Sequence, residues 1–329
     1  MCIRDRAGVE NVAASLAAGN AVVWKPSEKT PLSSRLLAER AFDALPPGLV
    51  NVLLGNGAGA GEPLATHPEV DVVVFVGSER TGQRLGALCA TRSKKAILEL
   101  GGKDALIVDE TVDIQAAARL AAEAAFANVG QICTSTERIY VHRKRFEPFV
   151  DALVAESARR RVGDGLDPAT DIGPLVDRLQ LSHVSSQVDE AVRLGGNLHF
   201  GGARLDRRGW FFPPTVLTGM PEDCSLMVEE TFGPVAPCVP FDDFDEALAK
   251  ANASRFGLAA ILCTRDSGRA IHATHSLKAG MVRINTLRGR SAGGTSEPAG
   301  SSGIGHGWGI EFLHELTRQK SVFWRGEPT

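Results

Sequence analysis

The chain has 329 residues, a formal net charge of −3 and a charged fraction of 23%, values typical of a globular protein with room for two domains. The nearly neutral charge gives no reason to expect nucleic acid or an anionic membrane as a partner. No apolar run approaches the roughly 20 residues of a membrane helix.

Cysteine usage and the start of the chain indicate the compartment. No two cysteines form a C-x-x-C pair, so neither a zinc site nor a redox dithiol is expected. Residues 1–6 (MCIRDR) lack the apolar core of a signal peptide, and a helix pattern follows at once. We expect reduced thiols in a cytoplasm, and an artefactual start fused to a truncated reading frame; a genuine short start is the alternative.

Helix and strand patterns alternate in the first part of the chain. Helices are predicted at 7–18, 31–42, 59–66 and 80–90, and strands at 21–25, 50–54, 71–76 and 95–100. Gly19-Asn20 is a helix-ending signal, and Pro31 suits the first turn of a helix. The alternation predicts a parallel sheet covered on both faces.

The second part of the chain has the same α/β character. Strands are predicted at 105–108, 137–142, 235–241, 257–264 and 281–285, and helices at 113–127, 146–160, 175–194, 244–253 and 266–277. Residues 288–309 are expected to be a Gly- and Ser-rich loop, and 320–324 a last strand.

Three segments at predicted strand ends suit a dinucleotide. FVGSERTG (75–82) places glycines and Ser78 where a helix begins, which suits phosphate; a plain capped turn is the alternative. GNGAGAG (55–61) has similar chemistry but is weaker evidence. In KPSE, Lys25 and Glu28 could reach ribose hydroxyls, and Glu28 would repel a 2′-phosphate, which favours NAD over NADP; a surface ion pair is the alternative.

Three further segments carry groups suited to catalysis. ELGGKD places Glu99 at the end of an apolar strand, where a shielded carboxylate can act as a general base. GQICTS places Cys133 after a turn, at the expected start of a new helix whose dipole would lower its pKa. EETFGPV places Glu230 and Phe232 beside a predicted strand. Each has a purely structural alternative when taken alone.

In this order the segments closely resemble blocks of the aldehyde dehydrogenase superfamily, from about Asn11 to Trp324. The blocks include LPPGLVNVLLGNG, ILELGGKDALIV, ANVGQICTSTERIYVH and EETFGPVAPC. The spacings of 34 residues from Glu99 to Cys133, and of 97 residues from Cys133 to Glu230, also resemble those of the family.

The resemblance implies that Cys133 adds to an aldehyde, that hydride passes to NAD to leave a thioester, and that Glu99 activates the water that hydrolyses it. NADP is the less favoured cofactor. The implied cofactor contacts are Lys25 and Glu28 at the adenine-side ribose, Gly77, Ser78 and Gly82 at the pyrophosphate, Glu230 and Phe232 at the nicotinamide side, and also Gly57 and Leu100.

The resemblance also implies an aldehyde-dehydrogenase-like α/β fold, with an intact parent that forms a dimer or tetramer. Residues 7–100 would be a partial Rossmann-type dinucleotide-binding domain, 101–303 the catalytic domain, and 304–329 a return segment with an oligomerisation strand. The expected partner is a small aldehyde.

Two departures from the family pattern leave alternatives open. The chain lacks an upstream Trp-Asn-Phe-Pro-like block, and residues 297–305 (EPAGSSGIG) lack the phenylalanine that the family usually shows near the substrate tunnel. The alternatives are a CoA-acylating semialdehyde dehydrogenase, which Glu99 argues against, and a catalytically inactive fragment. A free-standing cysteine hydrolase is remote, because no histidine lies in a recognisable motif for it.

Overall fold

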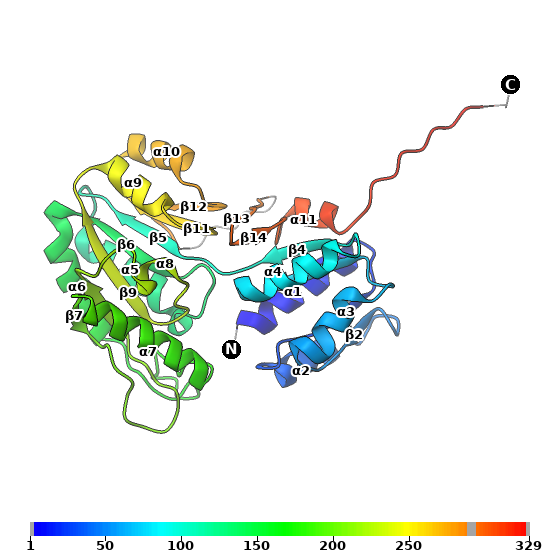
Figure 1. Cartoon of the computed structure of the whole chain (residues 1–329), viewed down its shortest axis with the longest axis horizontal. Coiled ribbons are helices and arrows are strands. Elements are labelled where there is room, and N and C mark those ends of the chain that lie inside the picture. Colours follow the sequence, from blue (N-terminus) through cyan, green and yellow to red (C-terminus); the bar gives the residue numbers. More distant parts are fainter. Residues whose placement is uncertain (1–2, 288–293, 327–329) are drawn as a thin grey trace.

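The computed structural model describes residues 3–287 and 294–326, with the side chains of 3–7 excepted. Two bodies of unequal size lie side by side, and the connection from β4 to β5 runs between them (Figure 1). Residues 1–2 of the expected artefactual start, and part of the loop expected at 288–309, lie outside the described residues. In the described part, no helix has the length and apolar character needed to cross a membrane.

The smaller body contains the N-terminal alternation of helices and strands. Its elements are α1 (Ile3–Ala17), β1 (Val22–Trp24), α2 (Pro31–Ala41), β2 (Val50–Val52), η1 (Gly57–Gly61), α3 (Glu62–Thr66), β3 (Val72–Val76), α4 (Glu79–Ala90) and β4 (Lys95–Glu99). Gly19, just beyond α1, has φ +87°, the left-handed conformation expected of a helix-ending glycine.

The strands of this body pair in parallel and end at matching positions. β1 pairs with β2, and β3 pairs with β4 with Val76 opposite Glu99. A strand from near the C-terminus adds to the second pair. This strand, β14 (Gly303–Ile304), lies antiparallel to β4, with Gly303 opposite Glu99. Glu99 therefore lies at the carboxyl end of β4, between two neighbouring backbone segments.

The larger body is built on a mostly parallel sheet, which among the described residues has seven strands in the order β12-β11-β5-β6-β9-β8-β7. Only the edge pairing of β7 with β8 is antiparallel. The elements are β5 (Asp104–Val108), α5 (Ile114–Phe126), η2 (Ala127–Gly130), β6 (Thr136–His142), η3 (Arg143–Arg145), α6 (Phe146–Ala158), α7 (Arg178–Arg193), β7 (Asn197–Phe200), β8 (Thr215–Thr218), α8 (Ser225–Val228), β9 (Val235–Phe241), α9 (Phe244–Asn252), β10 (Phe256–Gly257), β11 (Ala259–Cys263), α10 (Ser267–Ser276) and β12 (Met281–Ile284).

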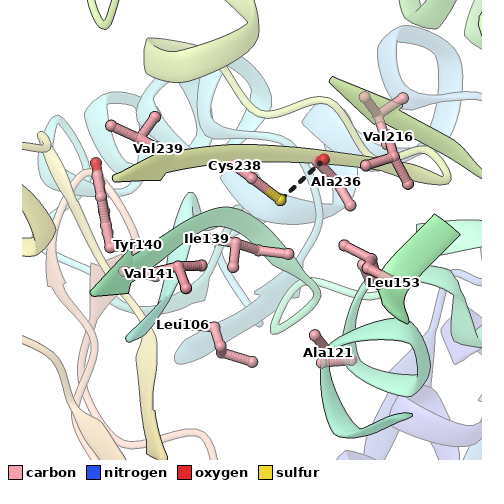
Figure 2. Packing of buried hydrophobic residues seen from close by; sticks show 14 of the residues in the cluster. Leu106, Ala121, Ile139, Tyr140, Val141, Leu153, Val216, Ala236, Cys238 and Val239 are labelled. Carbon is pink, nitrogen blue, oxygen red and sulfur yellow. Dashed lines mark hydrogen bonds between the residues drawn. The ribbon is translucent and has the colours of Figure 1, made fainter. Parts of the chain in front are cut away.

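The main core lies between the central strands of this sheet and the helices on its faces. Every residue of β5 and β6 is buried, as expected for central strands of a parallel sheet. Leu106 and Ile139 belong to one cluster with Ala121 of α5 and Leu153 of α6 (Figure 2). Alanines along α5 let this helix approach the sheet closely, which gives the sheet a rigid centre.

Most predicted elements have the expected type, with ends that coincide or are shifted by at most four residues. The short elements β7, β8 and α8 were not predicted, and the segment expected to be a loop contains β13 (Ala299–Gly300) and β14. Helix α11 (Ile310–Glu315) was also missed; its Phe312 packs with Leu316 onto Ile97 in a second core cluster. Such short elements have too few residues to show a periodic pattern.

The strand predicted at 320–324 is not formed. These residues pair with no strand in the part of the chain that the structure describes, and Phe323 and Trp324 are 96% and 91% exposed. An apolar pattern specifies a strand only where a sheet edge is available to pair with it. The segment extends away from the smaller body (Figure 1).

Candidate active site

Cys133 lies in a turn between η2 and β6, where the chain enters the larger sheet. The expected position at the start of a helix is wrong, because β6 rather than a helix follows. Asn128, Val129 and Gly130 have φ of 51°, 62° and 69°, and these left-handed residues turn the chain just before the cysteine. A side chain at Gly130 would collide with the backbone of Gly233, so this reversal requires glycine.

The surroundings of Cys133 disfavour its thiolate. Burial raises the pKa of the thiol to about 12, and the nearby carboxylates of Asp104, Glu99 and Glu230 act in the same direction. The expected lowering of this pKa is therefore wrong, because desolvation, helped by the nearby carboxyl groups, outweighs any backbone dipole. The thiol is neutral near pH 7 unless a base or a cation joins it.

Glu99 is the last residue of β4, and it contacts both the segment after β3 and the return segment. Its carbonyl accepts a hydrogen bond of 3.1 Å from the Gly77 N–H. Its carboxylate lies against the backbone of Gly307 in the return segment, where an added Cβ would collide with it. Glu99 is thus half-buried between the end of β3 and the return segment, close enough to influence the Cys133 thiol.

The predicted phosphate segment begins α4 at the carboxyl end of β3. Ser78 is the N-cap residue and is exposed; its hydroxyl donates to Thr81 Oγ1 at 3.0 Å rather than capping a backbone N–H. Gly82 is buried beneath the Leu100 side chain, which leaves no room for a Cβ. Gly82 therefore allows α4 to pack closely on the end of β4, and Leu100 is the buried residue that fills this contact.

The predicted ribose residues lie at the carboxyl end of β1. Lys25 Nζ donates to the Gly55 carbonyl at 3.0 Å and lies 3.8 Å from a carboxylate oxygen of Glu28. The Glu28 side chain is 54% exposed, so it is accessible to a ligand. Gly57 begins η1 in the same region, with open space where a Cβ would lie.

Glu230 and Phe232 come from a loop of the larger body, and Glu230 lies close enough to Cys133 to influence its thiol. Glu230 Oε1 accepts a hydrogen bond of 3.2 Å from the Gly102 N–H. Burial raises the pKa of Glu230 to about 8, with the charge of Glu137 acting in the same direction. Phe232 has φ +48°, an uncommon conformation for a residue with a side chain.

The turn at Gly101 and Gly102 brings these groups together. A Cβ at Gly102 would lie 2.6 Å from the Cys133 carbonyl oxygen, and one at Gly101 would lie 2.5 Å from Glu230 Oε2. The two glycines therefore let the nucleophile and the Glu230 carboxylate approach the same stretch of backbone. Glu99 precedes this turn by two residues.

Two buried groups beside this turn were not selected from the sequence. Asp104 is 4% exposed, burial raises its pKa, and its Oδ2 atom has no hydrogen-bond partner among the described residues. Lys103 forms a buried ion pair with Glu137. Both residues lie in the segment ILELGGKDALIV. The sequence alone does not show which of its charged side chains are buried. Within residues 3–287 and 294–326, no group of three His, Cys, Asp or Glu side chains could hold a metal ion.

Residues 7–322 match the model of a family described as the aldehyde dehydrogenase family. A mitochondrial aldehyde dehydrogenase of Leishmania tarentolae is 39% identical over 313 residues, which cover 94% of this chain and 62% of that protein. The crystal structure of lactaldehyde dehydrogenase from Escherichia coli superposes with a TM-score of 0.92 at 34% identity, over 96% of this chain and 66% of that one.

A structure of an aldehyde dehydrogenase from Bacillus cereus, described as an NAD+ complex, has a TM-score of 0.91 at 37% identity and covers 94% of this chain and 63% of that one. The chain thus spans somewhat under two-thirds of the length of these relatives. The agreement in structure confirms the predicted α/β fold. The chain belongs to the aldehyde dehydrogenase family.

Proposed function

We propose that this chain carries the nucleophile, the general base and most of the cofactor site of an NAD-dependent aldehyde dehydrogenase. The observation that carries the proposal is the convergence of Cys133, Glu99 and Glu230 on the Gly101–Gly102 turn, although they come from distant parts of the sequence. A thiol beside a carboxylate base, next to a loop suited to a nicotinamide, is the set of groups that this oxidation requires.

The residues at the carboxyl ends of the smaller body's strands fit a dinucleotide. Lys25 and Glu28 offer a donor and an acceptor to ribose hydroxyls, and the exposed start of α4 at Ser78 offers backbone N–H groups to phosphate. The Glu230 carboxylate lies beside Gly101, in the space that a Cβ would fill. There it could accept hydrogen bonds from the hydroxyls of the second ribose. When bound, NAD supplies the hydride acceptor and a positively charged ring.

The chain's own residues account for the other steps. Cys133 gives its proton to solvent water and its sulfur adds to the aldehyde carbonyl, which gives a hemithioacetal alkoxide. Loss of hydride from that carbon leaves a thioester on Cys133. Glu99 then takes a proton from water, the hydroxide adds to the thioester, and the carboxylate leaves as the thiol re-forms. A positively charged ring beside Cys133 would lower the high pKa of its thiol and so favour deprotonation.

The test is NADH formation with a panel of aliphatic, aromatic and semialdehyde substrates. We expect Cys133→Ala to abolish it, while Cys263→Ala, which alters a buried thiol in β11, retains it. Glu99→Gln should retain one turnover of NADH per site and block the next, because thioester hydrolysis would fail. Turnover that persists in Cys133→Ala would contradict the proposal.

The position of Glu99 favours water over CoA as the acyl acceptor. A carboxylate that influences the Cys133 thiol is placed to activate water at the thioester. We expect the product to be the free acid with or without added CoA. An acyl-CoA product, formed only when CoA is present, would support the alternative of a CoA-acylating enzyme.

The exposed Glu28 carboxylate supports NAD over NADP. A 2′-phosphate placed beside it would meet a like charge, which disfavours binding. We expect Glu28→Gln to raise the ratio of NADP to NAD activity, with Glu39→Gln on the exposed side of α2 as the matched control. We further propose the division into a cofactor part (7–100), a catalytic part (101–303) and a return segment (304–329), whose residues 320–324 would become an oligomerisation strand only when they pair with a partner subunit.

A further inference from the structure

Lys103 and Glu137 form an ion pair deep in the larger body. Lys103 Nζ lies 2.7 Å from Glu137 Oε2, and the two side chains are 0% and 3% exposed. Burial of two charges costs free energy that an ion pair alone rarely offsets. Stability therefore gives a weak explanation for this pair. The contacts that it makes with its surroundings are the better guide to its role.

Glu137 binds two consecutive backbone N–H groups of the loop that carries Glu230. The Thr231 N–H donates to Oε2 at 2.7 Å, and the Phe232 N–H donates to Oε1 at 2.8 Å. Lys103 Nζ also donates to Thr231 Oγ1 at 3.0 Å. Both charges of the buried pair are thus directed at one short stretch of loop.

Helix α7 holds the opposite side of the same stretch. Gln180 Nε2 donates to the carbonyls of Thr231 and Phe232, at 3.0 Å each. His183 Nε2 lies 2.9 Å from the Glu230 carbonyl. The amides and carbonyls of residues 231 and 232 therefore have side-chain partners from two separate elements, β6 and α7.

This loop needs such support because its backbone is strained. Phe232 has φ +48°, which the Cβ of a non-glycine residue disfavours. A strained residue persists only where its surroundings over-determine it. Release of the two N–H groups would let Phe232 relax and move the neighbouring Glu230 away from Gly102.

We propose that the Lys103–Glu137 pair is a positioning device that sets the Glu230–Phe232 loop for the nicotinamide half of the cofactor. This inference rests on the proposed NAD site. Neither side chain needs to touch the cofactor: Glu137 acts by fixing the backbone at 231 and 232, and Lys103 by holding the Glu137 carboxylate in place.

The test variant is Glu137→Gln, which retains the shape of the side chain. The amide oxygen of the new glutamine can accept a hydrogen bond from only one of the N–H groups of Thr231 and Phe232. Its NH₂ group would face the other N–H, and two donors cannot form a hydrogen bond. We expect faster hydrogen exchange at the amides of 231 and 232. The dissociation constant of NADH, followed by its fluorescence, should rise about tenfold, as loss of a charged buried hydrogen bond predicts.

The matched control is Asp109→Asn. Asp109 is also a fully buried carboxylate, directly after β5 of the same sheet, and it is bonded to Thr111, Thr264 and Arg269. Among the described residues, no side-chain hydrogen bond or ion pair joins it to the 230–232 loop. NADH affinity should be unchanged in this control. The far-UV circular dichroism spectrum should be unchanged in both variants, which separates loop positioning from general damage.

If NADH binds the wild type and Glu137→Gln equally, the positioning role is overturned and the proposed function stands. If the wild type binds no NADH, the proposed function fails, and this inference fails with it. Should Glu137→Gln not fold, Thr231→Val removes only the hydroxyl that accepts from Lys103. We expect it to weaken NADH binding about threefold, and unchanged binding would contradict the proposal.

Discussion

The carboxylate of Glu230 occupies the space directly beside Gly101. A Cβ at position 101 would lie 2.5 to 2.7 Å from its carboxyl atoms, closer than such contacts occur. The hydrogen bond from the Gly102 N–H fixes the carboxylate in that place. Two segments more than a hundred residues apart are thereby joined at a position where only glycine fits.

Gly101→Ala should displace Glu230 and weaken cofactor binding. We expect a rise of about tenfold in the KM for NAD, as loss of one charged hydrogen bond predicts. Gly165→Ala is the matched control, since a Cβ there meets open space. An unchanged KM for NAD in Gly101→Ala would show that Glu230 does not contribute to binding.

The reactivity of Cys133 should depend steeply on pH in the absence of cofactor. Burial raises its pKa to about 12, so the thiolate fraction grows about tenfold per unit between about pH 7 and pH 10. The alkylation rate by iodoacetamide should follow this rise without a plateau, as measured by mass spectrometry of the Cys133 peptide. A plateau below about pH 9 would contradict the raised pKa.

The same pKa shift has a consequence for stability. Because the folded state holds the proton more tightly than the unfolded chain, its contribution is fully present below the ordinary thiol pKa of 9.0 and is lost as the pH rises toward about 12. The free energy of unfolding of the wild type should therefore fall more steeply in this alkaline range than that of Cys133→Ala. Parallel curves in urea titrations would refute this.

Arg138 should be critical for stability although it has no direct place in the proposed reaction. It is 4% exposed and donates to the carbonyls of Lys103, Ala251 and Lys250 at 2.8, 2.8 and 3.0 Å. Arg138→Lys cannot reproduce this planar set of donors and should cost about 3 kcal/mol of unfolding free energy.

The matched control for Arg138→Lys is Arg143→Lys. Arg143 pairs with Asp242 at an exposed position, so its replacement should change the unfolding free energy by less than about 1 kcal/mol. Urea unfolding of both variants measures the difference. Equal effects would show that the buried bonds of Arg138 contribute no more than a surface ion pair.

Arg255 links the two bodies beside the proposed cofactor site. Its guanidinium lies 3.1 Å from Glu79 in the first turn of α4 and also pairs with Glu229, the neighbour of Glu230. Because Arg255 is 39% exposed, Arg255→Gln should change global stability by less than about 1 kcal/mol. Hydrogen exchange at residues 228–230 should increase, and high salt should produce the same increase in the wild type.

The sequence by itself specified the type and order of the long elements. Buried strands such as β5 and β9 appear as short apolar runs, and α5 as a long alanine-rich helix with an acidic cap, because their burial is regular along the chain. It also placed Glu99 and Glu230 beside strand ends. Element type and strand ends depend on residues that are close in the sequence, so the spacing of apolar and polar residues is enough to predict them.

Only the tertiary structure decided how the groups influence one another. The sequence suggested a lowered pKa for Cys133, but burial and three carboxylates from other segments raise it. The Lys103–Glu137 pair and its hydrogen bonds to Thr231 and Phe232 join three separate segments, which no spacing in the sequence reveals. Desolvation and the proximity of charges change a pKa, and both depend on which distant residues lie close together in the folded chain. Only the packing of the tertiary structure determines those contacts.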